Sequence, residues 1–189
     1  MLDLRNKNIY IGNQAVDRVY LGEELLKGDE PPIYIATDGD FEIVNRNHIY
    51  IGSALEVDIT DYVNRKDLTS VTYMFSGSYD ATPVTKVVLG PNNVTRMGYM
   101  FRSSLTTSLD LSTFDTSNVT NMGRMFRDFQ GTTLDLSSFD TSAVTDMTSM
   151  FMGSQSTIGY ARTQADADKF NSSSLKPAGL TFVVHPDLI

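Results

Sequence analysis

The chain has 189 residues, 41% hydrophobic content and no cysteine, which allows a folded core and excludes disulfides, thiolate metal sites and a cysteine nucleophile. Its formal net charge of −8 argues against a protein that binds nucleic acid or an anionic membrane surface, because both need a basic face. No apolar run approaches the roughly 20 residues of a membrane span. The first residues contain no apolar core of a signal peptide, so we expect a protein that is made in a cytoplasm.

Residues 1–53 are predicted to form a small antiparallel β-module. The dipeptide Gly22-Glu23 lies between strand-like runs and suits a tight hairpin turn. The acidic and proline-rich stretch at 29–32 predicts a break in the chain. Short strands are expected at 8–12, 17–22, 24–28, 32–36 and 48–52, the last two on either side of a turn at Asp38-Gly39-Asp40.

Three features of the chain could indicate a metal or catalytic site. Asp38, Asp40 and Glu42 resemble part of a calcium loop but lack the rest of its twelve-residue spacing, which favours a plain turn. His48 and His185 are far apart and outside any metal-ligand motif, so we interpret both as strand-edge residues. No phosphate loop, nucleophile elbow or dinucleotide fingerprint is present, and we expect neither catalysis nor a cofactor.

A repeated phrase dominates residues 54–189. Residues 109–126 and 134–151 are identical at 13 of 18 positions, with an offset of 25 residues. Each unit ends in Met-Phe, and the pairs recur at residues 74, 100, 125 and 150. Apolar residues ahead of each pair fall at i, i+3, i+6 and i+7, which is typical of one face of a short helix. A period in this range predicts a solenoid whose coils bury their apolar faces against each other.

The other half of each unit is predicted to be a short strand with its middle residue pointing outward. These strands are expected at 57–59, 87–89, 109–111 and 134–136. Phe114 and Phe139 should form a stacked ladder in the core, together with the methionines and phenylalanines of the Met-Phe pairs. The Asp-Thr-Ser runs at 115–117 and 140–142 are candidate caps of the predicted helices. The last unit, 163–189, should close the open end of the core with a polar helix from Thr163 and a strand at 180–184.

The phrases LDLSSFDTSAVTDMTSMF and GYARTQADADKFNSSSLKPAGLTFVV resemble the BspA-like leucine-rich repeats of bacterial surface proteins and phage proteins. The front phrase IYIGNQAVDRVYLGEELLKG resembles short N-terminal modules of phage tail and baseplate proteins. The two resemblances imply an α+β fold, a leucine-rich-repeat solenoid with a strand and a short helix in every coil of about 25 residues, preceded by the β-module. They also imply that residues 1–53 dock and residues 54–189 bind.

The candidate binding residues point outward from the predicted strands or lie in the loops beside them. Three aspartates should form a column on the strand face, where they could hold a cation or sugar hydroxyls, or instead bond to the backbone and to neighbouring Ser/Thr side chains. We favour the second interpretation because a cation needs several oxygens that converge on one point. The candidates are Asp58, Val88, Asp110 and Asp135 on the strands, and Tyr79 and Arg102 in the loops.

Three functions remain open from the sequence. The first is a non-enzymatic phage virion protein of the tail, the baseplate or the capsid surface, assembled in the host cytoplasm. It would contact other virion proteins through residues 1–53, and a homo-oligomer is compatible with it. The second is a bacterial cell-surface adhesin that binds a host protein or glycan. The third, a glycan hydrolase, would need two carboxylates roughly 5–9.5 Å apart in a cleft, and no such pair is evident.

Overall fold

The computed structural model describes residues 33–79, 81 and 83–189. Ahead of residue 33 it describes only the backbone of four strands, which pair antiparallel as β1 with β2 and β3 with β4. Leu21 pairs with Glu24, and the turn predicted at Gly22-Glu23 lies outside the described residues. The bounds of these strands are β1 Tyr10–Ile11, β2 Gln14–Ala15, β3 Tyr20–Leu21 and β4 Glu24–Leu25.

A hairpin of β6 (Phe41–Val44) and β7 (Asn47–Tyr50) follows. Its turn is formed by Asn45 and Arg46, with φ of 50° and 68°, the left-handed conformation that a tight two-residue hairpin needs at both central positions. The turn predicted at 38–40 is a 3-10 helix, η1 (Asp38–Asp40), directly ahead of β6. The hairpin turn therefore lies further along the chain than the sequence suggested.

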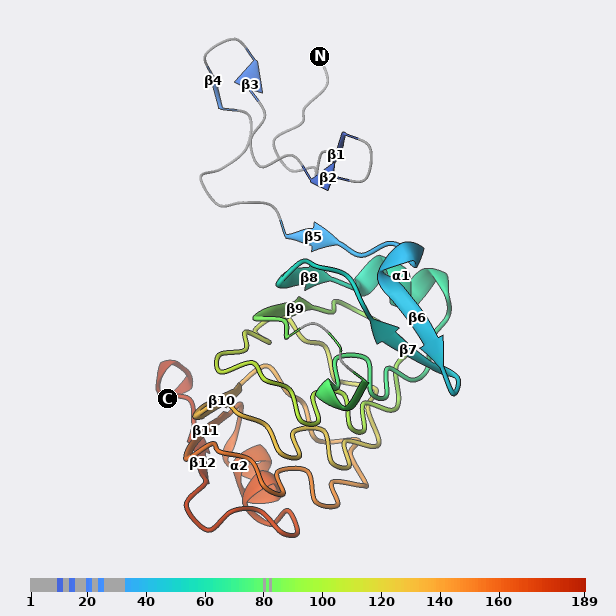
Figure 1. Ribbon diagram of the computed structural model, residues 1–189. Helices are drawn as coiled ribbons and strands as arrows, with labels where there is room; N and C mark the ends of the chain where they lie inside the picture. The colour runs from blue at the N-terminus through green and yellow to red at the C-terminus, as the bar shows by residue number, and fades with distance from the viewer. Residues whose placement is uncertain are drawn as a thin grey trace.

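The first parallel sheet has the order β5–β8–β9. The strands are β5 (Tyr34–Ile35), β8 (Glu56–Asp58) and β9 (Lys86–Val88), and Figure 1 shows them one below another. β5 pairs in parallel with β8, although we had expected it in an antiparallel module. Residues 33–53 therefore pack directly on the part of the chain that follows residue 53.

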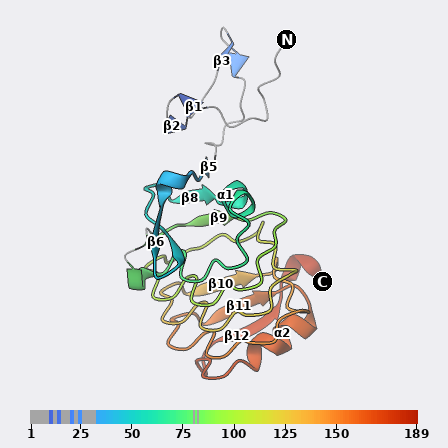
Figure 2. The same cartoon turned by 90° about the vertical axis from the view of Figure 1, so that its right-hand side faces the viewer.

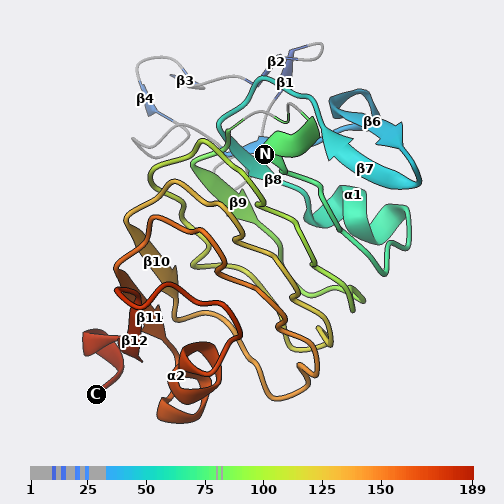
Figure 3. The same ribbon diagram turned by 60° about the horizontal axis from the view of Figure 1, so that its bottom comes forward.

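The second parallel sheet has the order β10–β11–β12. Its strands are β10 (Thr133–Leu136), β11 (Ile158–Ala161) and β12 (Thr181–Val184). Helix α2 (Gln164–Asn171) lies beside them (Figure 3), and the Thr163 hydroxyl at its start accepts a hydrogen bond from the backbone of Asp166. The helix and the last strand are where the sequence placed them, because a capped polar segment followed by Pro-x-Gly and a β-branched run is a strong local signal.

Single bridges, rather than a full strand, join β9 and Leu89 to the next segment of the chain. Lys86 bridges to Asp110, and Leu89 bridges to Phe114. The strand predicted at 109–111 is therefore reduced to one bridging residue. The remaining elements are one short helix and two 3-10 turns: α1 (Thr60–Arg65), η2 (Gly77–Tyr79) and η3 (Pro186–Leu188).

The predicted fold class, a leucine-rich-repeat solenoid with a strand and a short helix in every coil, is wrong. The described residues form a small α/β structure, with strands in separate sheets of two or three and with two α-helices, α1 and α2. Neither helix is long and apolar enough to cross a membrane. No helix follows the Asp-Thr-Ser runs that we had proposed as caps, and these runs form turns instead.

Backbone conformation explains why the Met-Phe segments do not form helices. The residue before each Met-Phe pair has φ between 54° and 64°, whereas an α-helix needs φ near −63°. These residues donate their N–H groups to a segment about 25 residues away instead of to their own turn, as Tyr99 does to the carbonyl of Gly123 at 3.0 Å. The four residues in this conformation are Tyr73, Tyr99, Arg124 and Ser149.

The predicted core is confirmed. The phenylalanines of successive Met-Phe pairs are fully buried and stack nearly parallel, with centroid distances of 5.6, 5.6 and 6.2 Å and interplanar angles of 8° or less. The separate ladder of Phe114 and Phe139 is also present, at 5.9 Å and 11°. The methionines of the pairs are buried as well, so they belong to the core and not to an open groove. Figure 2 shows the green, yellow and orange segments of the chain between β9 and β11 running side by side.

Candidate functional site

The outer strand face carries four of the six predicted binding residues. Asp58, Val88 and Asp110 are half-buried and Asp135 is exposed, while the inward neighbours Val57 and Val87 are fully buried. Asp58 lies beside Val88 in the sheet register. Asp110 instead bridges to Lys86, which lies two residues before Val88 on β9. The predicted column of three aspartates is therefore divided between two rows.

Asp110 and Asp135 are brought together at one open hollow of about 210 Å³. Asp110 forms an ion pair with the Lys86 ammonium at 3.1 Å, and the Asp135 carboxylate lies 3.7 Å from Nε2 of His185. Each carboxylate thus faces a basic group, which reduces the like-charge repulsion that we had expected between them. The hollow is lined by Ser108, Leu109, Asp110, Leu111, Ser112 and Asp135.

The aspartates of the strand face stabilise their own turns. One carboxylate oxygen of each accepts the backbone N–H two residues later, at 2.8 Å for Asp58, 2.9 Å for Asp110 and 3.0 Å for Asp135. Burial by itself raises the pKa of Asp110, but the hydrogen bonds from Ser112 and the nearby ammonium outweigh it and hold the pKa below its usual value. These contacts agree with the structural interpretation of the column.

The partial calcium loop and the histidines also have local partners. Asp38 binds Arg65 at 2.8 Å and Lys66 at 2.6 Å, and Asp40 accepts hydrogen bonds from Tyr34 and Thr37. Nδ1 of His48 lies 2.6 Å from the Tyr62 hydroxyl, and His185 accepts the backbone N–H of Asp187 at 3.2 Å. Within the described part of the chain, no group of three or more acidic or histidine side chains could hold a metal ion.

The loop residues Tyr79 and Arg102 belong to a different surface, which we call the Tyr–Arg cluster. The rings of Tyr73 and Tyr99 stack at 4.5 Å and 22°, and Tyr79 packs edge-on against Tyr73 at 5.3 Å and 84°. Two guanidinium groups flank Tyr99, with their carbons 5.8 and 5.4 Å from the ring centroid. The cluster consists of Tyr73, Tyr79, Tyr99, Arg102 and Arg124, all half-buried.

The backbone of the Met-Phe segments positions this cluster. Tyr73, Tyr99 and Arg124 each precede a Met-Phe pair, and their left-handed φ values turn the chain just before the buried Met and Phe side chains. Arg124 also donates from Nη1 to the Tyr99 hydroxyl at 2.9 Å. The sequence analysis selected Tyr79 and Arg102 but missed the other three residues. The signal that could have found them is the variable residue that directly precedes each Met-Phe pair.

The electrostatics of the Tyr–Arg cluster differ from those of the rest of the chain. Among the described residues, Arg102, Arg124 and the exposed Arg96 form no ion pair with a carboxylate, although the charge of Arg124 helps to lower the pKa of Asp146. Nε of Arg102 is buried and has no hydrogen-bond partner there. Burial, with a smaller contribution from the neighbouring tyrosines, raises the pKa of Tyr73, and Arg102 partly opposes this rise. Five other cationic side chains are ion-paired: Arg65, Lys66, Lys86, Arg127 and Arg162.

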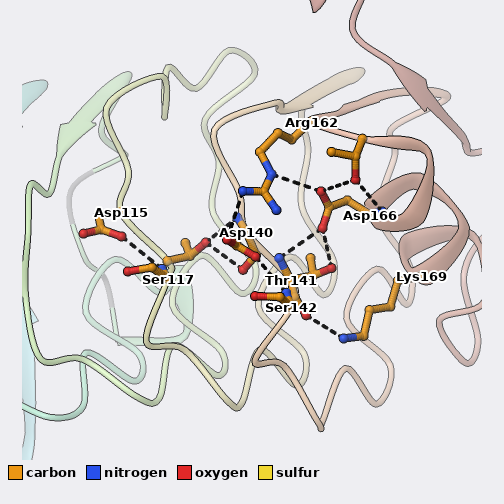
Figure 4. Close-up of polar contacts among 10 residues, drawn as sticks. Asp115, Ser117, Asp140, Thr141, Ser142, Arg162, Asp166 and Lys169 are labelled. Carbon is orange, nitrogen blue, oxygen red and sulfur yellow. Dashed lines mark hydrogen bonds and ion pairs between the residues drawn. The ribbon is translucent and has the colours of Figure 1, made fainter.

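A third polar group joins α2 to the segment before it (Figure 4). Arg162 bridges Asp140 at 2.9 Å and Asp166 at 3.2 Å. Asp166 is 3% exposed and accepts both the N–H and the hydroxyl of Thr141. Lys169 donates to the Thr141 carbonyl at 2.5 Å. Because its donors and acceptors are used internally, we interpret this group as structural.

Comparison with protein-family models gives one match, over residues 69–176, to the family described as "Mycoplasma protein of unknown function, DUF285". The chain belongs to the DUF285 family. The match agrees with the BspA-like resemblance of the repeated phrases and includes all five residues of the Tyr–Arg cluster. The resemblance of the front phrase to phage tail proteins lies outside the DUF285 match and stays a prediction. No curated protein and no solved structure matches the chain.

Proposed function

We propose that this DUF285 chain is a non-enzymatic structural protein of a phage particle, in the tail, the baseplate or on the capsid surface, and that it binds another protein through the Tyr–Arg cluster. The N-terminal phrase, which resembles phage tail and baseplate modules, supports the place in a particle. Docking through residues 1–53 remains part of this proposal.

The observation that carries the proposal is the composition and packing of the Tyr–Arg cluster. Tyrosine and arginine are the residues most enriched at energetically dominant positions of protein interfaces, together with tryptophan. Here three tyrosine rings pack against each other while remaining partly exposed, and two arginines flank them without a carboxylate partner among the described residues. Such rings offer a large contact area at a low cost in side-chain entropy, because they are held in place before binding.

An affinity pull-down from the native culture tests this function. The full chain carries a tag, and the proteins that it recovers are identified by mass spectrometry. We expect capsid, tail or baseplate proteins with the native chain and with Tyr160→Ala, which removes a half-buried tyrosine from the outer strand face. Tyr99→Ala should lose the protein that binds the Tyr–Arg cluster and keep those that dock through residues 1–53. Recovery that is the same for all three chains would contradict binding through the Tyr–Arg cluster.

The docking role of the N-terminal region has a separate test. Residues 33–53 pack with the later sheets, as the pairing of β5 with β8 shows, so a deletion of 1–53 would disturb the fold. A deletion of residues 1–32 avoids this problem. We expect the shortened chain to fold but to be absent from purified particles, and its incorporation at the native level would refute docking through this region.

The alternative is a bacterial cell-surface adhesin that binds a host protein or glycan. One observation favours it, because the family description names a bacterium and no phage. The same pull-down separates the two functions. Recovery of envelope or host-matrix proteins without particle components would establish the adhesin and refute the virion protein.

A further inference from the structure

We propose that the Tyr–Arg cluster binds a carboxylate side chain of an acidic partner protein, and that Arg102 is the residue that receives it. This inference rests on the proposed binding function and adds the chemistry of the partner. It does not depend on whether the partner belongs to a virion or to a cell surface.

The first argument is the unused hydrogen-bonding capacity of Arg102. A guanidinium group carries five N–H donors in a planar fork that matches a carboxylate. Nε of Arg102 is buried with no partner among the described residues, whereas the great majority of buried polar groups in folded proteins have one. Its guanidinium carbon lies 5.8 Å from the centroid of the Tyr99 ring, so the ring restricts where the fork points. Because Nε is buried, a carboxylate from a partner would bind the terminal N–H groups of the fork, which donate no hydrogen bond to a described residue.

The second argument is the distribution of charge. The chain has a formal net charge of −8. Five of its other described cationic side chains already form ion pairs with carboxylates. Arg102 and Arg124 both lie against the Tyr99 ring and bring two positive charges to this surface of an acidic protein. The charge of Arg124 also acts on Asp146, whose pKa it helps to lower, which leaves Arg102 as the cation of the cluster without a carboxylate neighbour among the described residues. A positively charged surface attracts a partner of opposite charge. It also repels a second copy of this acidic chain less strongly than the rest of the molecule does.

The third argument concerns the kind of acidic partner. The tyrosines place apolar ring surface directly beside the arginines, with Tyr73 and Tyr99 stacked at 4.5 Å. A phosphate polymer would be bound by exposed cations that follow its backbone, and it would gain little from stacked and half-buried rings. A protein surface with an acidic side chain next to apolar groups matches both parts of the cluster.

The test is a titration of the full chain, labelled with nitrogen-15, with a synthetic peptide of eight glutamates. The Nε–H signal of Arg102 is followed by NMR. We expect this signal and the amides of Tyr99 and Arg102 to shift, and a peptide of eight glutamines to leave them unchanged. The substitution Arg102→Gln should weaken binding about tenfold, as expected for the loss of a charge-assisted hydrogen bond.

Two variants separate a specific site from general charge. Arg102→Lys keeps the charge but loses the planar fork, and we expect it also to weaken binding. Arg46→Gln removes one charge from the exposed hairpin turn and should change the affinity less than twofold, an order-of-magnitude expectation for an unrelated surface charge.

Three results would overturn the inference. The first is equal weakening by Arg46→Gln and Arg102→Gln, which would indicate general attraction. The second is full affinity in Arg102→Lys. The third is tighter binding of a DNA duplex through the same residues, which would make a phosphate polymer the ligand. Particle proteins recovered in the pull-down together with any of these results would leave the proposed function intact and refute the inference alone.

Discussion

Asp166 accepts two hydrogen bonds from Thr141, one from the backbone nitrogen at 3.1 Å and one from the hydroxyl at 2.6 Å. In the preceding segment the equivalent threonine, Thr116, exchanges hydrogen bonds with the backbone of Asp140. The Asp166 side chain thus takes over, at the end of the chain, a role that the main chain of a following segment plays elsewhere. This explains how α2 is anchored to the segment before it.

We expect Asp166→Ala to lower the free energy of unfolding by about 2–4 kcal/mol, because it leaves the buried N–H and hydroxyl of Thr141 without an acceptor. Urea denaturation measures the loss. Asp168→Ala is the control, since Asp168 is exposed in the same helix and should change stability by no more than about 0.5 kcal/mol. Equal losses in the two variants would show that the contact with Thr141 is not responsible.

The same contact predicts a dependence of stability on pH. Burial alone would raise the pKa of Asp166, but hydrogen bonds from Thr141, Thr163 and Arg162 outweigh it and lower the pKa. A carboxyl group whose pKa is lower in the folded state contributes stability above its unfolded pKa, about 3.9. That contribution is lost as the pH falls through the folded value.

Urea denaturation between about pH 6 and pH 2 tests this dependence. We expect stability to fall below about pH 4, and the fall to be shallower in Asp166→Asn, which cannot take up the proton. Some of the slope should remain, because the hydrogen bonds from Ser142 and the guanidinium of Arg162 also lower the pKa of Asp140. An unchanged slope in Asp166→Asn would show that Asp166 does not contribute.

The side-chain amide of Asn171 binds both backbone groups of Phe182, its Nδ2 donating to the carbonyl and its Oδ1 accepting the N–H, each at 2.9 Å. This contact covers part of the edge strand β12, and exposed strand edges promote aggregation. We expect Asn171→Ala to speed hydrogen exchange at the Phe182 amide and to increase light scattering on heating. Asn171→Asp keeps the acceptor and should protect that amide better than Asn171→Ala does.

Phe126 lies between the rings of Phe101 and Phe151 and is fully buried. We expect Phe126→Ala to cost about 3–5 kcal/mol of unfolding free energy, since it removes a large buried ring and leaves a cavity. Phe126→Leu retains more of the volume and should cost clearly less. Chemical denaturation measures both, and a similar cost for the two substitutions would mean that the neighbouring rings collapse into the space.

The sequence was sufficient to predict features that depend on local chemistry or strict periodicity. These are the buried phenylalanine ladders, the helix after Thr163 and the final strand. The left-handed residues before each Met-Phe pair were not predictable, because tyrosine and arginine carry no local signal for positive φ. Their conformation depends on hydrogen bonds to a segment about 25 residues away, and the helical pattern of apolar residues was therefore misleading.

The candidate site was only partly predictable for a related reason. Tyr79 and Arg102 were selected as polar or aromatic loop residues, but their contact partners Tyr73, Tyr99 and Arg124 were not. The side-by-side packing of the segments brings these residues together, and no single unit contains more than part of the cluster. The pairing of β5 with β8 across residue 53 was missed in the same way, since a parallel pair requires a long connection that has no sequence signature of its own.

The left-handed backbone at Tyr73, Tyr99 and Arg124 has a consequence for how the protein could change under selection. A residue with a side chain costs on the order of 1 kcal/mol or more in this conformation, whereas glycine adopts it freely. Selection for heat resistance alone should therefore favour glycine at these three positions, and the cluster would disappear as the protein became more stable. A thermostable descendant that still carries tyrosine or arginine there would identify these positions as ones where binding is worth more to the organism than stability.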